Sequence, residues 1–151
     1  DTTPTNIERA HQIGALFENA RFIHMQRNGK DTISSVLNEL WGPKKPLVAI
    51  DWWKRKLQLA NRATRQLSPG QYLNIRLEDL VTEKRSGTYR EILDFLKISD
   101  QEQMSKYFAE EVDGDRAHIG RWKADDRLDA EFHSKFERAV LELHDEGISA
   151  Y

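Results

Sequence analysis

The chain contains no cysteine, which excludes disulfide bridges, thiolate zinc sites and cysteine nucleophiles. No stretch approaches the roughly 18 apolar residues that span a bilayer, and no signal-peptide pattern opens the chain. Neither sign of charge is in excess, since 32% charged residues leave a net charge of −2, and this balance argues against nucleic acid as a partner. These absences predict a soluble protein, and the missing cysteines favour a reducing, cytoplasmic compartment.

Several catalytic signatures are absent as well. The sequence has no nucleophile elbow, no dinucleotide-binding glycine fingerprint and no phosphate-cradling P-loop. Its five histidines make no metal cluster, because His133 and His144 share a helical face but lie about 16 Å apart on it. The residues therefore predict no metal site, and no catalytic residue can be assigned from them.

Hydrophobic periodicity predicts a helix-rich α/β protein. Apolar runs at 22–25 and 72–77 are typical of strands, the second covered on both faces. A first helix is expected to begin at Pro4, and the capping box of Thr5 with Glu8 is an alternative start for the same helix. Ser99 with Glu102 makes a capping box for a later helix. The helix after the first strand is expected to end at the stop signal Trp41-Gly42-Pro43. Three further helices are expected at residues 47–66, 86–96 and 128–144.

Two buried faces can be predicted from this spacing. The first helix, to about residue 18, is expected to bury Ala10 and Phe17, and the helix after the first strand is expected to bury Ile33, Val36 and Leu40. Strand, helix, helix, strand, helix is the order of a parallel sheet covered by helices. We expect one domain over residues 1–151.

The stretch at 20–40, ARFIHMQRNGKDTISSVLNEL, joins the first strand to a helix through a charged, glycine-containing turn. Arg27 follows the strand and Ser35 lies about one helical turn in, so both can face one pocket at the carboxyl edge of the sheet. A guanidinium fork and a hydroxyl suit a phosphate. The alternative is a solvated turn with a helix-capping serine.

Two other clusters are candidates of lower weight. Gly120-Arg121-Trp122-Lys123 could clamp an anionic, aromatic ligand through backbone N–H groups, charge and stacking, or could be a surface loop pinned by one tryptophan. Carboxylates at the end of the second strand could act in acid–base chemistry. A structural role is favoured there, with Asp79 capping a helical turn and Glu78 pairing with a cation.

Together these segments resemble the sulfotransferases that use 3′-phosphoadenosine 5′-phosphosulfate (PAPS). The stretch at 20–40 is similar to that family's 3′-phosphate-binding segment, although Asn28 and Lys30 stand where Asp and Arg are usual. The stretch YLNIRLEDLV at 72–81 resembles the R-Y-E-D-L strand end, and IGRWK at 119–123 the late nucleotide-covering loop. Thr3-Pro4 resembles the Thr-Pro step before the preceding helix, with Thr2 where many members carry Lys.

The resemblance implies a P-loop-kinase-like parallel sheet flanked by helices, lacking here its N-terminal strand, and PAPS or its product PAP (3′-phosphoadenosine 5′-phosphate) as bound nucleotide. It implies that the 3′-phosphate is held by Arg27 and Ser35. The nucleotide would be covered by Gly120, Arg121, Trp122 and Lys123, with Arg116 a weaker candidate. The family's 5′-phosphosulfate loop does not occur in the sequence, so the chain is expected to be a fragment of a larger domain.

Three functions follow as hypotheses. The favoured one is transfer of a sulfuryl group from PAPS to a hydroxyl or amine acceptor. The second is a non-catalytic binding module whose sheet is completed by a partner chain, for which a homo-oligomer is one form. The third is a fragment of another P-loop-like phosphotransferase. The acceptor is not encoded in any motif, although the aromatic residues at 41–53 could shape its pocket.

Overall fold

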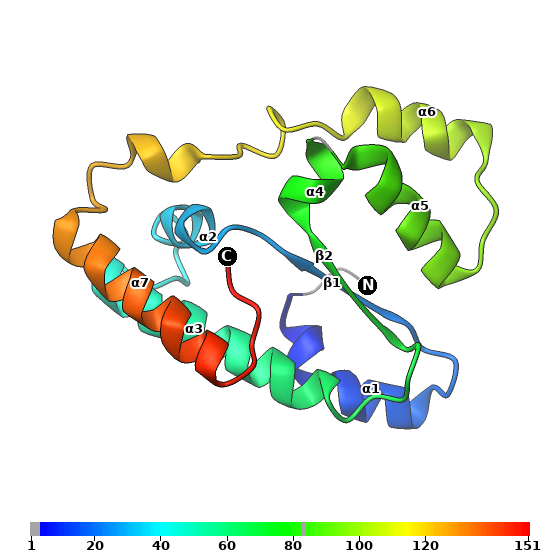
Figure 1. Cartoon of the computed structure of the whole chain (residues 1–151), viewed down its shortest axis with the longest axis horizontal. Coiled ribbons are helices and arrows are strands. Elements are labelled where there is room, and N and C mark those ends of the chain that lie inside the picture. Colours follow the sequence, from blue (N-terminus) through cyan, green and yellow to red (C-terminus); the bar gives the residue numbers. More distant parts are fainter. Residues whose placement is uncertain (1–3, 83) are drawn as a thin grey trace.

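The computed structural model describes residues 4–82 and 84–151. Two 3₁₀ helices, seven α-helices and two strands follow one another along these residues (Figure 1). Thr2 and Thr3, part of the expected Thr-Pro step, lie outside them. The elements are η1 (Pro4–Arg9), α1 (Ala10–Leu16), β1 (Phe22–Gln26), α2 (Gly29–Val36), α3 (Pro46–Thr64), β2 (Tyr72–Arg76), α4 (Leu77–Val81), α5 (Arg85–Leu96), α6 (Glu102–Glu111), η2 (Arg121–Ala124) and α7 (Ala130–Asp145).

The sheet consists of β1 and β2 side by side, in the parallel arrangement that the sequence predicts. The register runs from Phe22 opposite Tyr72 to Gln26 opposite Arg76. Both strands therefore end at the same edge, where Arg27 begins the turn to α2 and Leu77 begins α4. In parallel sheets this carboxyl edge is where ligands bind.

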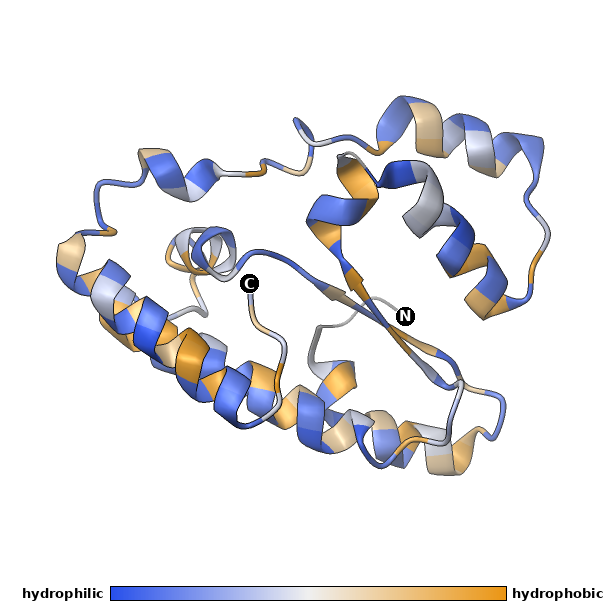
Figure 2. Ribbon diagram, viewed as in Figure 1, coloured by the Kyte–Doolittle hydropathy of each residue, from blue (hydrophilic) through white to orange (hydrophobic). Residues whose placement is uncertain are grey.

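The hydrophobic core lies where α2, α3 and α7 meet, and we call these three helices the core side. Ile33, Ile50 and Phe132, one from each helix, are fully buried. Trp53 of α3 stacks on Phe136 of α7 with ring centroids 5.0 Å apart. Figure 1 shows α3 and α7 running alongside each other, and Figure 2 shows apolar residues along both helices.

Local sequence explains where these helices begin. Pro46 occupies the first position of α3, where its missing N–H costs no hydrogen bond. The carboxylate of Asp129 caps α7 by accepting from the N–H of Phe132 at 2.9 Å, a contact worth about 1 kcal/mol. Both helices match the predicted ranges within two residues at each end.

Helices α5 and α6 form an antiparallel pair away from the core, which we call the hairpin (Figure 1). Tyr89 of α5 stacks on Phe108 of α6, with centroids 4.4 Å apart, and Arg85 donates hydrogen bonds to the carbonyls of Phe108 and Val112. No residue of α6 is buried. The expected Ser99 cap is wrong, because α6 begins after Gln101 and has no side-chain cap.

Two predicted core positions are also wrong. Leu40 is 96% exposed because α2 ends at Val36 and the chain turns back; at Gly42 it passes so close to the carbonyl of Val36 that no side chain would fit. Phe17 is 64% exposed because α1 ends at Leu16, before that side chain can reach the core. Among the described residues, no helix has the length and apolarity needed to cross a membrane.

Candidate functional site

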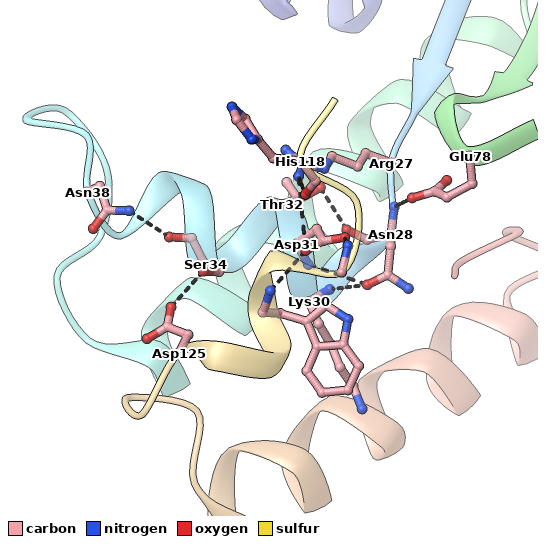
Figure 3. A network of polar contacts seen from close by, with 12 residues as sticks. Arg27, Asn28, Lys30, Asp31, Thr32, Ser34, Asn38, Glu78, His118 and Asp125 are labelled. Carbon is pink, nitrogen blue, oxygen red and sulfur yellow. Dashed lines mark hydrogen bonds and ion pairs between the residues drawn. The ribbon is translucent and has the colours of Figure 1, made fainter. Parts of the chain in front are cut away.

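The candidate site begins at the turn between β1 and α2, seen from close by in Figure 3. Asn28 caps α2 by accepting hydrogen bonds on Oδ1 from the N–H groups of Lys30 (3.0 Å) and Asp31 (3.3 Å). The N–H of Gly29 donates to the carbonyl of Tyr151 at 2.6 Å. Because these helix-terminal amides are already engaged, side chains are the groups left to bind an anion here.

Gly29 has a packing role in this turn. A Cβ at this position would lie 2.5 Å from Cζ2 of Trp53 and 2.8 Å from the ring of Phe136. Real Cβ atoms do not approach heavy atoms so closely, so only glycine allows the turn to sit against the two core aromatic residues. The turn is therefore positioned by the core side.

Glu78, at the start of α4, fixes the turn from the neighbouring strand end. Its Oε1 accepts from the N–H of Asn28 at 2.7 Å (Figure 3). The predicted pairing of Glu78 with a cation is therefore replaced by a bond to a backbone amide. Asp79 does not cap α4, which has no side-chain cap, and instead pairs with Lys84 at 3.3 Å.

Arg27 points its guanidinium toward the late loop. Its Nη2 donates to the carbonyl of His118 at 2.7 Å, 91 residues away in the chain, and lies 4.0 Å from Oδ1 of Asp31. Its Nε is buried and has no partner among the described residues. A guanidinium has five N–H donors, so Arg27 retains donors for a further acceptor such as a phosphate oxygen.

Ser35 lies on α2 three residues after Thr32, so the two share a helix face. Thr32 and Arg27 both line the cavity described below, whereas Ser35 is not among its lining residues. Ser35 is half-buried, and within the described ranges its hydroxyl makes no hydrogen bond. The neighbouring Ser34 faces elsewhere, donating to Oδ2 of Asp125 at 2.6 Å.

The late loop reaches this turn through a buried carboxylate. Oδ2 of Asp31 accepts from the N–H of Gly120 at 2.8 Å, and Oδ1 accepts from the N–H of Trp122 at 3.0 Å. Gly120 has φ +78°, a left-handed conformation that favours glycine. The ammonium of Lys30 lies 4.7 Å from the centroid of the Trp122 ring, so it supports that ring and does not join Arg27.

The structure brings some predicted site residues together and leaves one apart. Arg27, Gly120 and Trp122 meet at the turn, while Arg121 and Lys123 are exposed on η2 beside it. Arg116 is exposed and pairs with Glu111 and Asp113 in the segment that leads from the hairpin. Its charge is already matched by two carboxylates.

A cavity of about 550 Å³ adjoins Arg27. Four consecutive residues, 24–27, line it together with apolar and aromatic side chains of α3 and Tyr151, so the cavity runs along the free edge of β1. His24 bonds Tyr72 through Nδ1 at 3.0 Å, and burial lowers the pKa of His24 from 6.5 to about 4. The imidazole is therefore neutral at pH 7. Trp41 and Trp52, expected near an acceptor pocket, line this cavity.

Sequence reasoning missed Asn28, Asp31 and Glu78 as the residues that hold the site together. Asn28 before a helix is a recognisable cap, but the partners of Asp31 and Glu78 lie 89 and 50 residues away. The only local signal for Asp31 is its position four residues after Arg27, where a helix places an opposite charge nearby.

Comparison with known proteins adds the following. Residues 1–102 match the family model described as "Sulfotransferase family". A solved structure described as a sulfotransferase domain from the curacin biosynthetic pathway superposes with a TM-score of 0.64 at 20% identity, over 99% of this chain. The chain spans 60% of the length of that domain, whose fold it shares. A search of curated proteins found no match.

Proposed function

The chain belongs to the sulfotransferase family, and we propose that it acts in the transfer of a sulfuryl group from PAPS to a hydroxyl or amine acceptor. The family match supports the reaction class. The likeness to a solved sulfotransferase domain supports the fold, a helix-covered parallel sheet of the P-loop-like kind. PAPS as donor is part of the proposal.

In this proposal Arg27 and Ser35 hold the 3′-phosphate of the nucleotide. Arg27 supplies charge-assisted hydrogen bonds from the donors that His118 leaves unused, and Ser35 supplies a neutral donor. Gly120, Arg121, Trp122 and Lys123 cover the nucleotide, with charge from the two cations and an indole ring for stacking. Arg116 contributes less because Glu111 and Asp113 already compensate its charge. The nucleotide itself supplies the sulfuryl group.

One observation carries the proposal: the turn after β1 meets the late loop, since Arg27 donates to His118, 91 residues away and just before the loop, and Asp31 accepts from Gly120 within it. Two segments that resemble nucleotide-binding parts of one family are thus adjacent in space. The unpartnered Nε of Arg27 fits a site that is completed by an anion.

The direct test is calorimetric titration of the protein with PAP. We expect Arg27→Ala to weaken PAP binding at least about 10-fold, because a hydrogen bond between charged groups contributes roughly 1.5–3 kcal/mol. Arg90→Ala is the matched control, since Arg90 is exposed on α5 and makes the same change in charge. Equal affinity for wild type and Arg27→Ala would refute the assignment.

A second experiment tests whether the bound nucleotide is PAPS or ATP. In a thermal-shift comparison we expect PAP or PAPS to raise the melting temperature more than ATP does. Preference for ATP would favour a phosphotransferase instead, and PAPS binding without any sulfate transfer to a panel of alcohols and amines would favour a binding module.

A further inference from the structure

Asp31 is the most deeply buried charged residue at the site. Its side chain is 1% exposed, and its two oxygens accept hydrogen bonds from the amides of Gly120 and Trp122. Arg27 is the nearby cation, with Nη2 4.0 Å from Oδ1. Figure 3 shows the carboxylate between α2 and the late loop.

This burial has an energetic consequence for the loop. A buried carboxylate is costly unless its oxygens are hydrogen-bonded and its charge is compensated. If the loop moved away, Asp31 would exchange both amide donors for water, and a hydrogen bond to a charged group contributes roughly 1.5–3 kcal/mol beyond its bond to water. The closed position is therefore favoured by the chain itself, without help from a ligand.

A second contact between α2 and the loop region provides a comparison. Ser34 donates to Asp125, just beyond η2, and Asp125 also pairs with Arg127 at 2.7 Å. The two contacts bracket η2, yet only the Asp31 contact lies beside Arg27. Opening the loop at Gly120 would break the first contact and leave the second intact.

We propose that Asp31 is a positioning residue that holds Gly120 and Trp122 closed beside Arg27 before nucleotide binds. The inference rests on the proposed function for its effect on PAP, but not for its effect on the loop. Asp31 does not contact the nucleotide: its oxygens are taken by the loop amides. By fixing those amides it also fixes the position of Arg121 between them.

A simpler electrostatic role makes the opposite prediction. If Asp31 were only a negative charge near a phosphate site, then Asp31→Asn would remove a repulsion and tighten PAP binding. If Asp31 positions the loop, the same variant weakens binding, because an amide cannot accept on both atoms. The sign of the change therefore distinguishes the two roles.

The test uses amide hydrogen exchange and PAP titration on the same variants. In ligand-free wild type we expect the amides of Gly120 and Trp122 to exchange more slowly than that of Arg121. In Asp31→Asn we expect both to exchange at least about 10-fold faster and the Kd for PAP to rise roughly 10-fold to 100-fold, as for loss of one or two charge-assisted hydrogen bonds. Ser34→Ala, the control, should change neither.

Several outcomes would overturn the proposal. These are fast exchange of both amides in wild type, unchanged exchange in Asp31→Asn, tighter PAP binding by that variant, or an equal loss of affinity in Ser34→Ala. The wild-type measurement decides even if Asp31→Asn fails to fold. If wild type binds no PAP, the proposed function fails, while exchange still decides whether Asp31 holds the loop.

Discussion

The core side and the hairpin are both helical, but they are held by different interactions. On the core side, large apolar residues of α2, α3 and α7 are fully buried against one another. In the hairpin, α6 buries none of its residues, and Arg85 secures it by donating hydrogen bonds to backbone carbonyls. The site residues proposed here, Arg116 excepted, lie on or against the core side. The site is therefore built on the part of the molecule whose side chains are most deeply buried.

The largest expected effect is a difference in lost stability between alanine variants of two phenylalanines, one on the core side and one in the hairpin. Phe132→Ala should cost about 3–5 kcal/mol of stability, because it empties a fully buried position of α7. Phe108→Ala in α6 should cost about 1–2 kcal/mol, since Phe108 is only half-buried. Urea unfolding measures both. Equal losses would mean that the hairpin is as well packed as the core side.

Acid should remove a contribution to stability that comes from His24 of β1. Burial holds the pKa of His24 at about 4 in the folded protein, below its ordinary value of 6.5. The unfolded chain therefore takes up a proton first as the pH falls, and stability present above pH 6.5 is lost between pH 6.5 and about 4. The loss should be about 3 kcal/mol. The hairpin, residues 85–112, contains no histidine.

The His24→Gln variant isolates the contribution of His24, because the carboxylates titrate in wild type and variant alike. The unfolding free energies of both proteins are measured at pH 7, 5.5 and 4.5. The value for wild type minus the value for the variant should fall steadily as the pH is lowered. A difference that stays constant with pH would show that His24 is not the group responsible.

Replacing a glycine by alanine should have opposite effects on stability on the core side and in the hairpin. Gly29→Ala should destabilise by about 1–3 kcal/mol, because its Cβ would overlap Trp53 and Phe136. Gly87→Ala should stabilise by about 0.5–1 kcal/mol, since it lies in α5 with open space around it. Thermal unfolding of both variants is sufficient, and destabilisation by Gly87→Ala would contradict the account of the hairpin.

The smallest effect is expected at Arg116, in the segment that joins the hairpin to the late loop. Its ion pairs with Glu111 and Asp113 are exposed, and such pairs contribute little to stability. Arg116→Ala should change the affinity for PAP by no more than about twofold in a titration. A loss comparable to that of Arg27→Ala would place the nucleotide nearer the hairpin than proposed.

Sequence patterns predicted the elements whose signal is local. Helical spacing over residues 47–66 predicted α3, and the order of the apolar runs and the helices between them predicted two parallel strands. Leu40 was misplaced because its position depends on how closely the chain returns past Val36 at Gly42. Such a close return is a tertiary contact that periodicity does not encode.

The site shows the same limit. Residue chemistry made Arg27 and the Gly120 loop candidates, and the family resemblance selected them; the structure places the two segments in contact. It could not select Asp31 or Glu78, because each acts through a backbone amide that lies far along the chain. A backbone amide has no residue type, so no sequence pattern marks it as a partner.

The bond between Asp31 and Gly120 also bears on the order of folding. It joins residues 89 positions apart, and closing so long a loop is entropically costly until other contacts have brought its ends together. Packing of α7 against α3 would do this, since α7 follows the loop directly. We therefore expect the Gly120 amide to gain protection after those of α3 and α7 in pulsed-exchange refolding. Protection at Gly120 before α7 would contradict this order.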